Sequence, residues 1–332
     1  MRALVLSGGG SKGAFQVNVL KSLQKDNPDL DYDIYTGVSV GALNAVLLAT
    51  GPLKDSLPDL EKVWLEDIKG SASVRKHRIL KAIMGMTISM IVLGILAFIA
   101  FLVSWHKLIV ITFILGVLVI GSLLVGFFFF KKISSNRSIY DTAPLRSIVQ
   151  NRLNIKKLKS SGKLLRVGSV SYQTGEYRTA NEQSDNIVDW VMASSAFPIF
   201  FPMPEIDGHN WTDGGVKETA PLRDAIELGA TQIDVILTFP LDMKKETDTR
   251  ITYQISRVIG LMANDIMINV IHDEMINKRG IKIRIIAPKK HFKFNPLDFK
   301  PKEIREMYNA DYEIIESPHE SSLSAYVVDY DM

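Results

Sequence analysis

A long apolar stretch, residues 82–130, limits the possible folds of this chain more than any other part of its sequence. Of its 49 residues, 37 are hydrophobic, and Lys107 is the one charged side chain. A short polar break ending at Lys107 divides it into residues 82–103 and 108–130. As a helix, each segment is long enough to cross the hydrocarbon core of a bilayer, about 30 Å. Because the connection is very short, we expect an inserted transmembrane hairpin over residues 79–132.

The charges around this stretch predict its orientation. Its outer ends are flanked by basic residues, namely Arg75, Lys76, Arg78, Lys81, Lys131, Lys132 and Arg137. The predicted tip carries only Lys107. Because loops rich in Lys and Arg stay on the cytoplasmic side, we expect both outer ends and the rest of the chain in the cytoplasm. A hairpin buried in a protein core and a re-entrant loop are the alternatives, although a core helix rarely lacks a polar face.

The composition of the remaining chain is that of an ordinary globular domain. The protein has 39 Lys and Arg residues against 36 Asp and Glu residues, which gives a net charge of +3. This charge is too small to indicate a nucleic-acid partner. The sequence has no cysteine, which excludes disulfide frameworks, cysteine-ligated metal centres and thiol nucleophiles.

Apolar strands alternate with amphipathic helices on both sides of the apolar stretch. We expect strands at residues 2–6, 32–36, 164–172, 232–239 and 281–287. We expect helices at residues 14–25, 42–48, 60–68, 187–195, 221–228, 252–277 and 302–312. This alternation predicts an α/β fold, with a mostly parallel sheet covered by helices on both faces.

A glycine-rich loop, Ser7-Gly8-Gly9-Gly10-Ser11-Lys12-Gly13, follows the first predicted strand. One interpretation is a dinucleotide fingerprint, because glycines at this spacing precede Asp29, Asp31 and Asp33 by about 20 residues. The other is a set of backbone N–H groups at a helix N-terminus, which stabilise a developing oxyanion. The loop alone leaves both interpretations open.

The sequence Gly37-Val38-Ser39-Val40-Gly41 lies between a predicted strand and a predicted helix. This G-x-S-x-G pattern is typical of a nucleophile elbow, in which a sharp turn exposes the serine hydroxyl. A serine nucleophile needs a base. None of the six histidines lies in a convincing triad context: His77, His106, His209, His272, His291 and His319. Asp213, before Gly214 and Gly215, is the remaining candidate, although such an Asp is often a turn residue.

These motifs, in this order, resemble the patatin-like phospholipase family, and in particular bacterial-type members. Ala193-Ser194-Ser195-Ala196-Phe197-Pro198 and Leu297-Asp298-Phe299 are also similar to that family. The resemblance covers the whole chain except about residues 70–138. The family commonly has Asp at the position of Ser7 and Asn near Glu218-Thr219, and it does not generally carry an apolar hairpin.

The resemblance implies a three-layer α/β/α fold and a carboxylic ester hydrolase. The sequence shows no calcium-loop signature, so we expect no metal or other cofactor. In the implied hydrolase, Ser39 is the nucleophile and Asp213 is the base of a Ser–Asp dyad that forms an acyl-enzyme intermediate. The oxyanion hole consists of Gly8, Gly9 and Gly10. Further positions support the motifs without a defined role, namely Lys12, Gly13, Gly37, Gly41, Gly214 and Gly215. The implied activity is that of a phospholipase A or lysophospholipase acting on glycerolipid esters of the membrane.

Because the glycine loop and Ser39 precede the apolar stretch and Asp213 follows it, we expect one catalytic domain over residues 1–332. Its globular part consists of residues 1–72 and 134–332. We expect a multi-pass protein of a bacterial inner membrane, with the catalytic domain in the cytoplasm. Two alternatives remain: a catalytically idle patatin-like scaffold, and a nucleotide-binding membrane protein of the Rossmann type. The second alternative leaves Ser39 and Asp213 unexplained.

Overall fold

The computed structural model describes residues 1–77, 138–241, 280–292 and 295–316, with scattered residues between 87 and 127 and three between 254 and 261. The predicted helix at 252–277 and most of the predicted hairpin, helices 82–103 and 108–130, lie outside the described residues. Within the described part of the chain, no helix has the length and apolar character needed to cross a membrane.

A mixed nine-stranded sheet forms the centre of the described structure, in the order β11-β10-β9-β1-β2-β5-β8-β7 with β6 beside β5. The strands are β1 Arg2–Leu6, β2 Ile34–Val38, β5 Leu164–Ser171, β6 Tyr177–Ala180, β7 Glu205–Ile206, β8 His209–Asp213, β9 Gln232–Ile236, β10 Lys282–Pro288 and β11 Tyr312–Glu316. The five strands from β10 to β5 are parallel, and β6, β7, β8 and β11 pair antiparallel. The α/β fold with a central sheet is therefore confirmed, and its parallel part occupies the middle of the sheet.

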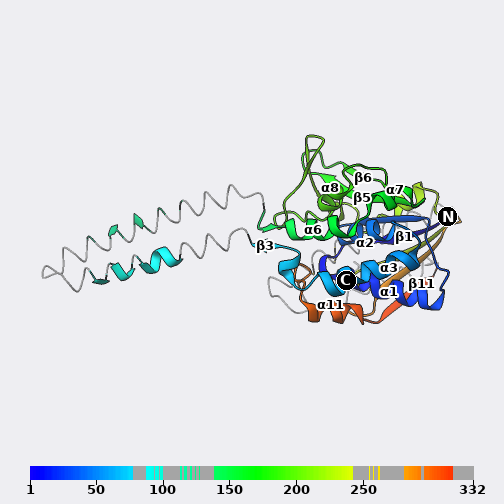
Figure 1. The fold of residues 1–332 in the computed structure, drawn as a ribbon, viewed down its shortest axis with the longest axis horizontal. Helices are drawn as coiled ribbons and strands as arrows, with labels where there is room; N and C mark the ends of the chain where they lie inside the picture. Colours follow the sequence, from blue (N-terminus) through cyan, green and yellow to red (C-terminus); the bar gives the residue numbers. More distant parts are fainter. Residues whose placement is uncertain are drawn as a thin grey trace, which may run out of the picture. The chain divides into compact units, whose positions relative to one another are not determined.

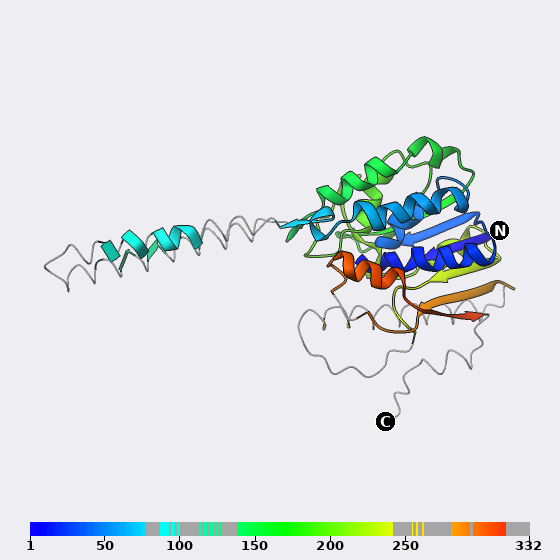
Figure 2. The same cartoon turned by 60° about the horizontal axis from the view of Figure 1, so that its bottom comes forward.

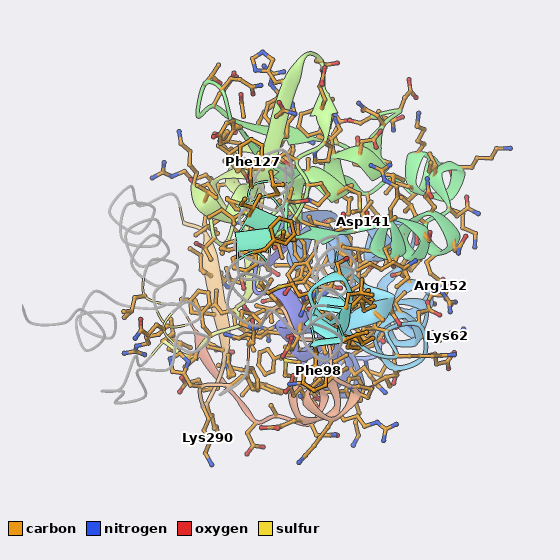
Figure 3. The ribbon with its side chains drawn as sticks, turned by 90° about the vertical axis from the view of Figure 1, so that its left-hand side faces the viewer. Lys62, Phe98, Phe127, Asp141, Arg152 and Lys290 are labelled. Atoms are coloured by element: carbon orange, nitrogen blue, oxygen red, sulfur yellow. The ribbon has the colours of Figure 1, made fainter. Side chains whose placement is uncertain are left out.

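The helices are α1 Gly13–Asp26, α2 Val40–Leu48, α3 Leu53–Lys62, α6 Ala143–Arg152, α7 Ile155–Ser160, α8 Ile187–Ser194, α9 Leu222–Glu227 and α11 Pro301–Tyr308. A π-helical turn, η2 Val63–Asp67, extends α3. Figures 1 and 2 show α1, α3 and α11 side by side against the sheet. The guanidinium group of Arg152, labelled in Figure 3, donates two hydrogen bonds to Asp67, so the end of α6 is tied to η2.

The sheet separates two hydrophobic cores because successive side chains of a strand point to opposite faces. Leu4 and Leu6 of β1 belong to the larger core, together with residues of α1, α2, α3, α8 and α11. Ala3 and Val5 belong to the second core, together with residues of α9. Burial on both faces explains why β1 is a continuous apolar run.

The largest differences from the predicted boundaries lie in two helices. The last helix ends at Tyr308, and Tyr312 begins β11, which pairs with β10. The helix predicted at 60–68 instead begins at Leu53 and contains Pro58. Pro58 is tolerated inside this helix because the buried Leu53, Leu57 and Leu60 attach it to the core.

The chain divides into two compact units. The first, residues 1–75, 142–198 and 203–332, contains all the elements above. The second consists of residues 76–141 and 199–202, and in it β3 Lys76–His77 pairs antiparallel with β4 Tyr140–Asp141. The N–H of Ile139 donates to the carbonyl oxygen of Ile199 at 3.0 Å. The predicted boundaries, 1–72 and 134–332 around 79–132, remain a prediction.

Candidate active site

The glycine loop leaves the carboxyl end of β1 in a conformation that needs glycine. Gly9 has φ 155° and Gly10 has φ 60°, both in a range that side chains disfavour. A Cβ atom on Gly9 would lie 2.1 Å from Oγ1 of Thr238, and one on Gly10 would lie 2.2 Å from the carbonyl oxygen of Pro296. The loop is therefore packed closely from two sides, and the consecutive glycines are required by this packing.

The backbone N–H groups of the loop are not equivalent. The N–H of Gly8 donates to the carbonyl oxygen of Thr219 at 3.0 Å. This corrects the prediction for Gly8, because an N–H group that already has an acceptor is not free to bind an oxyanion. Among the described residues, no acceptor receives the N–H groups of Gly9 or Gly10. These two N–H groups are therefore the ones in the loop that are available to a ligand.

The glycine loop lies directly beside Ser39, since a Cβ atom on Gly8 would be 3.2 Å from Cβ of Ser39. Lys12, at the end of the loop, is buried, and this burial lowers its pKa to about 8. The side chain therefore remains mostly protonated at pH 7. Gly13 begins α1, and a Cβ atom there would lie 2.4 Å from the side chain of Val40, so the loop also packs on the start of α2.

A series of hydrogen bonds between buried side chains ends on the backbone of the glycine loop. Nε2 of Gln16 donates to the carbonyl oxygen of Ser7 at 2.9 Å, and Nδ2 of Asn44 donates to Oε1 of Gln16 at 2.8 Å. Nε1 of Trp64 donates to Oδ1 of Asn44 at 3.0 Å. Sequence reasoning missed these residues. Their signal was a polar side chain at a core position of an otherwise apolar helix face.

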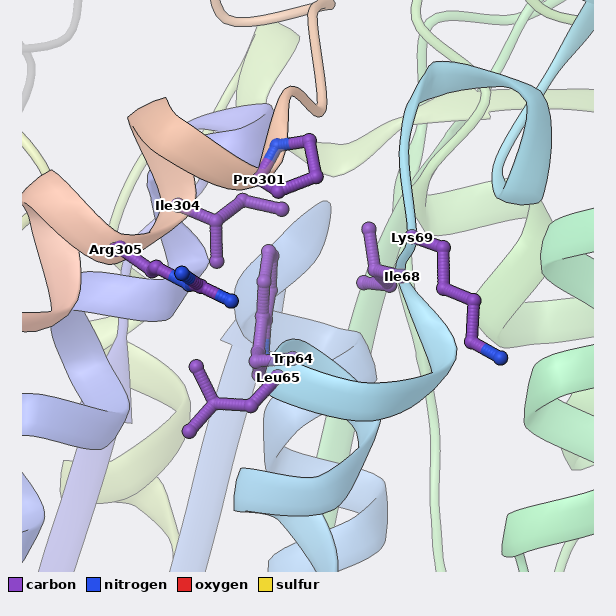
Figure 4. A pocket seen from close by; sticks show the side chains of 7 residues that line it. All are labelled: Trp64, Leu65, Ile68, Lys69, Pro301, Ile304 and Arg305. Atoms are coloured by element: carbon purple, nitrogen blue, oxygen red, sulfur yellow. The ribbon is translucent and has the colours of Figure 1, made fainter.

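Trp64 also borders a cavity of about 160 Å³. Figure 4 shows its lining residues, which are Trp64, Leu65, Ile68, Lys69, Pro301, Ile304 and Arg305. Neither Ser39 nor Asp213 lines this cavity. We therefore do not assign it to the site around the serine.

Ser39 occupies a sharp turn between β2 and α2, as the G-x-S-x-G pattern predicts. Its backbone has φ 55° and ψ −128°, which is unusual for a residue with a side chain. Such a conformation costs about 1–3 kcal/mol and persists where its surroundings hold it. The flanking glycines allow close contact, because a Cβ atom on Gly37 would lie 2.3 Å from the carbonyl oxygen of Gly41. A Cβ atom on Gly41 would lie 2.1 Å from the carbonyl oxygen of Leu6.

Asp213 is the last residue of β8, and its side chain is only 3% exposed. Its Oδ1 accepts a hydrogen bond from the N–H of Gly215 at 2.8 Å. A Cβ atom on Gly214 would lie 2.4 Å from the carbonyl oxygen of Gly168, so this turn also needs a glycine. Burial raises the pKa of Asp213 to about 6, against the opposing effects of the Ser39 side chain and the Gly215 N–H. The structure thus brings Ser39 and Asp213 together.

Several residues of the competing interpretations have partners away from Ser39 and Asp213. Asp33 accepts the N–H of Arg2 at 2.8 Å, and Asp31 forms an ion pair with Lys163 at 2.6 Å. The imidazole of His209 lies 3.1 Å from Oγ of Ser171, and that of His291 lies 3.2 Å from a nitrogen of Arg257. The side chains of the other four histidines lie outside the described part: His77, His106, His272 and His319.

A serine at a strained strand–helix turn, a buried carboxylate beside it and an adjacent glycine loop together form a candidate site of the serine-hydrolase type on an α/β fold. The family model of patatin-like phospholipases matches residues 4–226, about two thirds of the chain, and includes Ser39 and Asp213. The chain therefore belongs to the patatin-like phospholipase family, whose members are lipid acyl hydrolases.

Comparison with individual proteins gives matches among the solved structures. No curated protein matches the chain. Among solved structures, the crystal structure of VipD from Legionella pneumophila is similar, with 15% sequence identity and a TM-score of 0.37. The match covers 95% of this chain and 68% of VipD. The family assignment rests on the family model.

Proposed function

We propose that this protein is a serine lipid acyl hydrolase that cleaves carboxylic esters of glycerolipids with a dyad of Ser39 and Asp213. The observation that carries the proposal is the buried carboxylate of Asp213, with a pKa of about 6, beside a serine at a strained turn. A carboxylate with this pKa is mostly ionised at pH 7 and is a stronger base than an exposed one. The pair can therefore deprotonate and use a hydroxyl without histidine.

In the first half-reaction, Oγ of Ser39 attacks the ester carbonyl carbon while Asp213 accepts the proton of the hydroxyl. The carbonyl oxygen becomes an oxyanion, which the N–H groups of Gly9 and Gly10 stabilise. Loss of one such donor typically lowers kcat by about 10²- to 10³-fold. When the intermediate collapses, the bond to the alcohol oxygen breaks and that oxygen takes the proton from Asp213. The alcohol, a lysolipid or glycerol derivative, leaves an acyl ester on Ser39.

In the second half-reaction, Asp213 accepts a proton from water as the water oxygen attacks the acyl carbon. The same N–H groups stabilise the second oxyanion. Collapse breaks the bond to Oγ of Ser39, which recovers its proton from Asp213. The fatty acid is released, and the dyad returns to its starting state.

We further propose that residues 82–130 anchor the enzyme in a bilayer as a hairpin. The apolar sequence supports this proposal, as do the exposed apolar side chains of the described helical residues in this stretch. The rings of Phe98 and Phe127, labelled in Figure 3, are 62% and 61% exposed. Anchoring raises the local concentration of lipid ester, which favours a phospholipase A or lysophospholipase activity. The basic flanks favour a catalytic domain on the cytoplasmic side of a bacterial inner membrane.

The test compares the full chain with Ser39→Ala, Asp213→Asn and a control, Ser147→Ala, on the surface of α6. Hydrolysis of a short p-nitrophenyl ester and of glycerophospholipid vesicles is measured, together with labelling by a fluorophosphonate. The wild type and the control are expected to hydrolyse and to be labelled, and Ser39→Ala to do neither. Labelling of Ser39→Ala at the wild-type rate would refute the proposal. A wild type that neither hydrolyses nor is labelled would favour the idle scaffold.

A further inference from the structure

The buried hydroxyl of Ser194, at the C-terminal end of α8, forms a hydrogen bond with the backbone of the turn at Ser39. Ser194 is fully buried. Its Oγ accepts the N–H of Ser39 at 2.9 Å and donates to the carbonyl oxygen of Gly168 at 2.6 Å. A serine hydroxyl has a single proton, so donation to Gly168 leaves its lone pairs for Ser39. The hydroxyl of Ser194 is therefore an acceptor toward Ser39 and a donor toward Gly168.

The Gly168 end of this bridge lies next to Asp213. β5 pairs with β8 in a register that places Ser169 opposite Asp213. Two residues after Ser194, the carbonyl oxygen of Ala196 accepts the N–H of Asp213 at 3.1 Å. Residues 194–196 therefore bind the backbone of both members of the proposed dyad.

This contact matters because the backbone of Ser39 is strained. A positive φ in a residue with a side chain persists only where neighbouring groups hold it. The hydrogen bond to Ser194 fixes the peptide plane before Ser39, and with it the direction in which Oγ leaves the turn. Displacing a reacting atom by about 1 Å can lower the rate by about 10²-fold. A group that fixes this direction therefore acts on the reaction without touching the substrate.

We propose that Ser194 is a positioning residue, whose hydroxyl orients Ser39 against Asp213. It also occupies the N–H of Ser39, which is therefore not available to an oxyanion. The inference rests on the proposed dyad and adds to it a residue outside the reacting atoms. A serine that served only to pack α8 would be replaceable by any side chain of similar volume, whereas a positioning serine needs its oxygen.

The test uses the full chain and a p-nitrophenyl butyrate assay. Ser194→Ala is expected to lower kcat by about 10- to 100-fold with KM changed by less than about twofold. Ser194→Cys keeps the volume but is a weak acceptor, so the same loss of kcat is expected in a variant that folds readily. Ser194→Thr keeps the hydroxyl and is expected to recover most of kcat.

Ser56→Ala is the matched control, because Ser56 is a buried serine of α3 with a hydrogen bond to the carbonyl oxygen of Pro52. Both Ser56→Ala and Ser194→Ala are expected to lower Tm. Only Ser56→Ala is expected to leave kcat unchanged. Wild-type kcat in both Ser194→Ala and Ser194→Cys would overturn the inference, as would equal losses of kcat in Ser56→Ala. Failure of the dyad itself is recognised separately, by wild-type activity in Ser39→Ala with Ser194 intact.

Discussion

Replacing Asp213 with Asn is expected to abolish hydrolysis and, at neutral and alkaline pH, to stabilise the fold. The carboxylate is buried, and its pKa in the folded protein is about 6, against an ordinary value of 3.8. This difference of about 2 units corresponds to about 3 kcal/mol at about 1.4 kcal/mol per unit. The ionised carboxylate therefore destabilises the fold, and Asn removes that charge while its amide oxygen can still accept the N–H of Gly215.

The direction of the pKa shift of Asp213 decides how the gain in stability depends on pH. Because the folded pKa lies above the unfolded one, the folded protein binds more protons between pH 4 and pH 6, and stability falls as pH rises through this window. Asp213→Asn is thus expected to gain about 3 kcal/mol at pH 8 and about half of that at pH 5. The gain vanishes below about pH 3, where both states of the wild type are protonated.

The assay is urea unfolding of the full chain in one detergent at pH 8 and pH 5, with the variant and the wild type side by side. Asp29→Asn, at an exposed position, is the control and is expected to stay within about 0.5 kcal/mol of wild type at both pH values. A variant that is less stable than wild type at pH 8 would refute the reasoning. So would a gain that is the same at pH 8 and pH 5.

Three further outcomes are expected. The kcat/KM of the wild type falls about tenfold between pH 7 and pH 5, because Asp213 must be ionised to accept a proton and its pKa is about 6. A flat pH profile across this range would contradict the role of Asp213 as the base. Gly9→Ala lowers kcat at least 100-fold, because the new Cβ meets Thr238, whereas Gly51→Ala, with nothing within 4 Å, leaves kcat unchanged; equal kcat values for the two variants would exclude Gly9 from the site. Replacement of residues 79–132 by a short glycine–serine linker preserves hydrolysis of p-nitrophenyl butyrate and abolishes hydrolysis of phospholipid vesicles; loss of both activities would show that the segment also supports the catalytic fold.

Local sequence patterns predicted the elements that carry the glycine loop and Ser39, but not the strand β8 that ends at Asp213. The apolar run of β1 leads directly into the glycine loop, and the turn at Ser39 is a five-residue pattern, so each of these short segments already contains its own geometry. The turn from β2 to α2 needs glycine on both sides of Ser39, and the sequence shows this directly. Asp213 was ambiguous from its own surroundings, because an Asp before two glycines is also a common turn. The order of the motifs and the resemblance to a family were needed to select it.

The remaining features depend on contacts between distant parts of the chain. Gly8 could not be excluded from the oxyanion hole in advance, because its acceptor is the carbonyl oxygen of Thr219, over 200 residues away. Ser194 had no local signal of its contact with Ser39. The helical pattern of the sequence extends to Tyr312. Only the pairing of β11, Tyr312–Glu316, with β10 shows that the chain turns back there. Tertiary hydrogen bonds of this kind are not encoded in any short window of sequence.

The role of Ser39 is best decided by trapping the acyl-enzyme. The full chain is mixed with an excess of a short-chain ester, quenched in acid during turnover, and its peptides are weighed by mass spectrometry. The mechanism predicts one acyl group on the peptide that contains Ser39, its absence in Ser39→Ala, and its much slower formation in Asp213→Asn. An acyl group on another residue, or continued hydrolysis by Ser39→Ala, would contradict the mechanism.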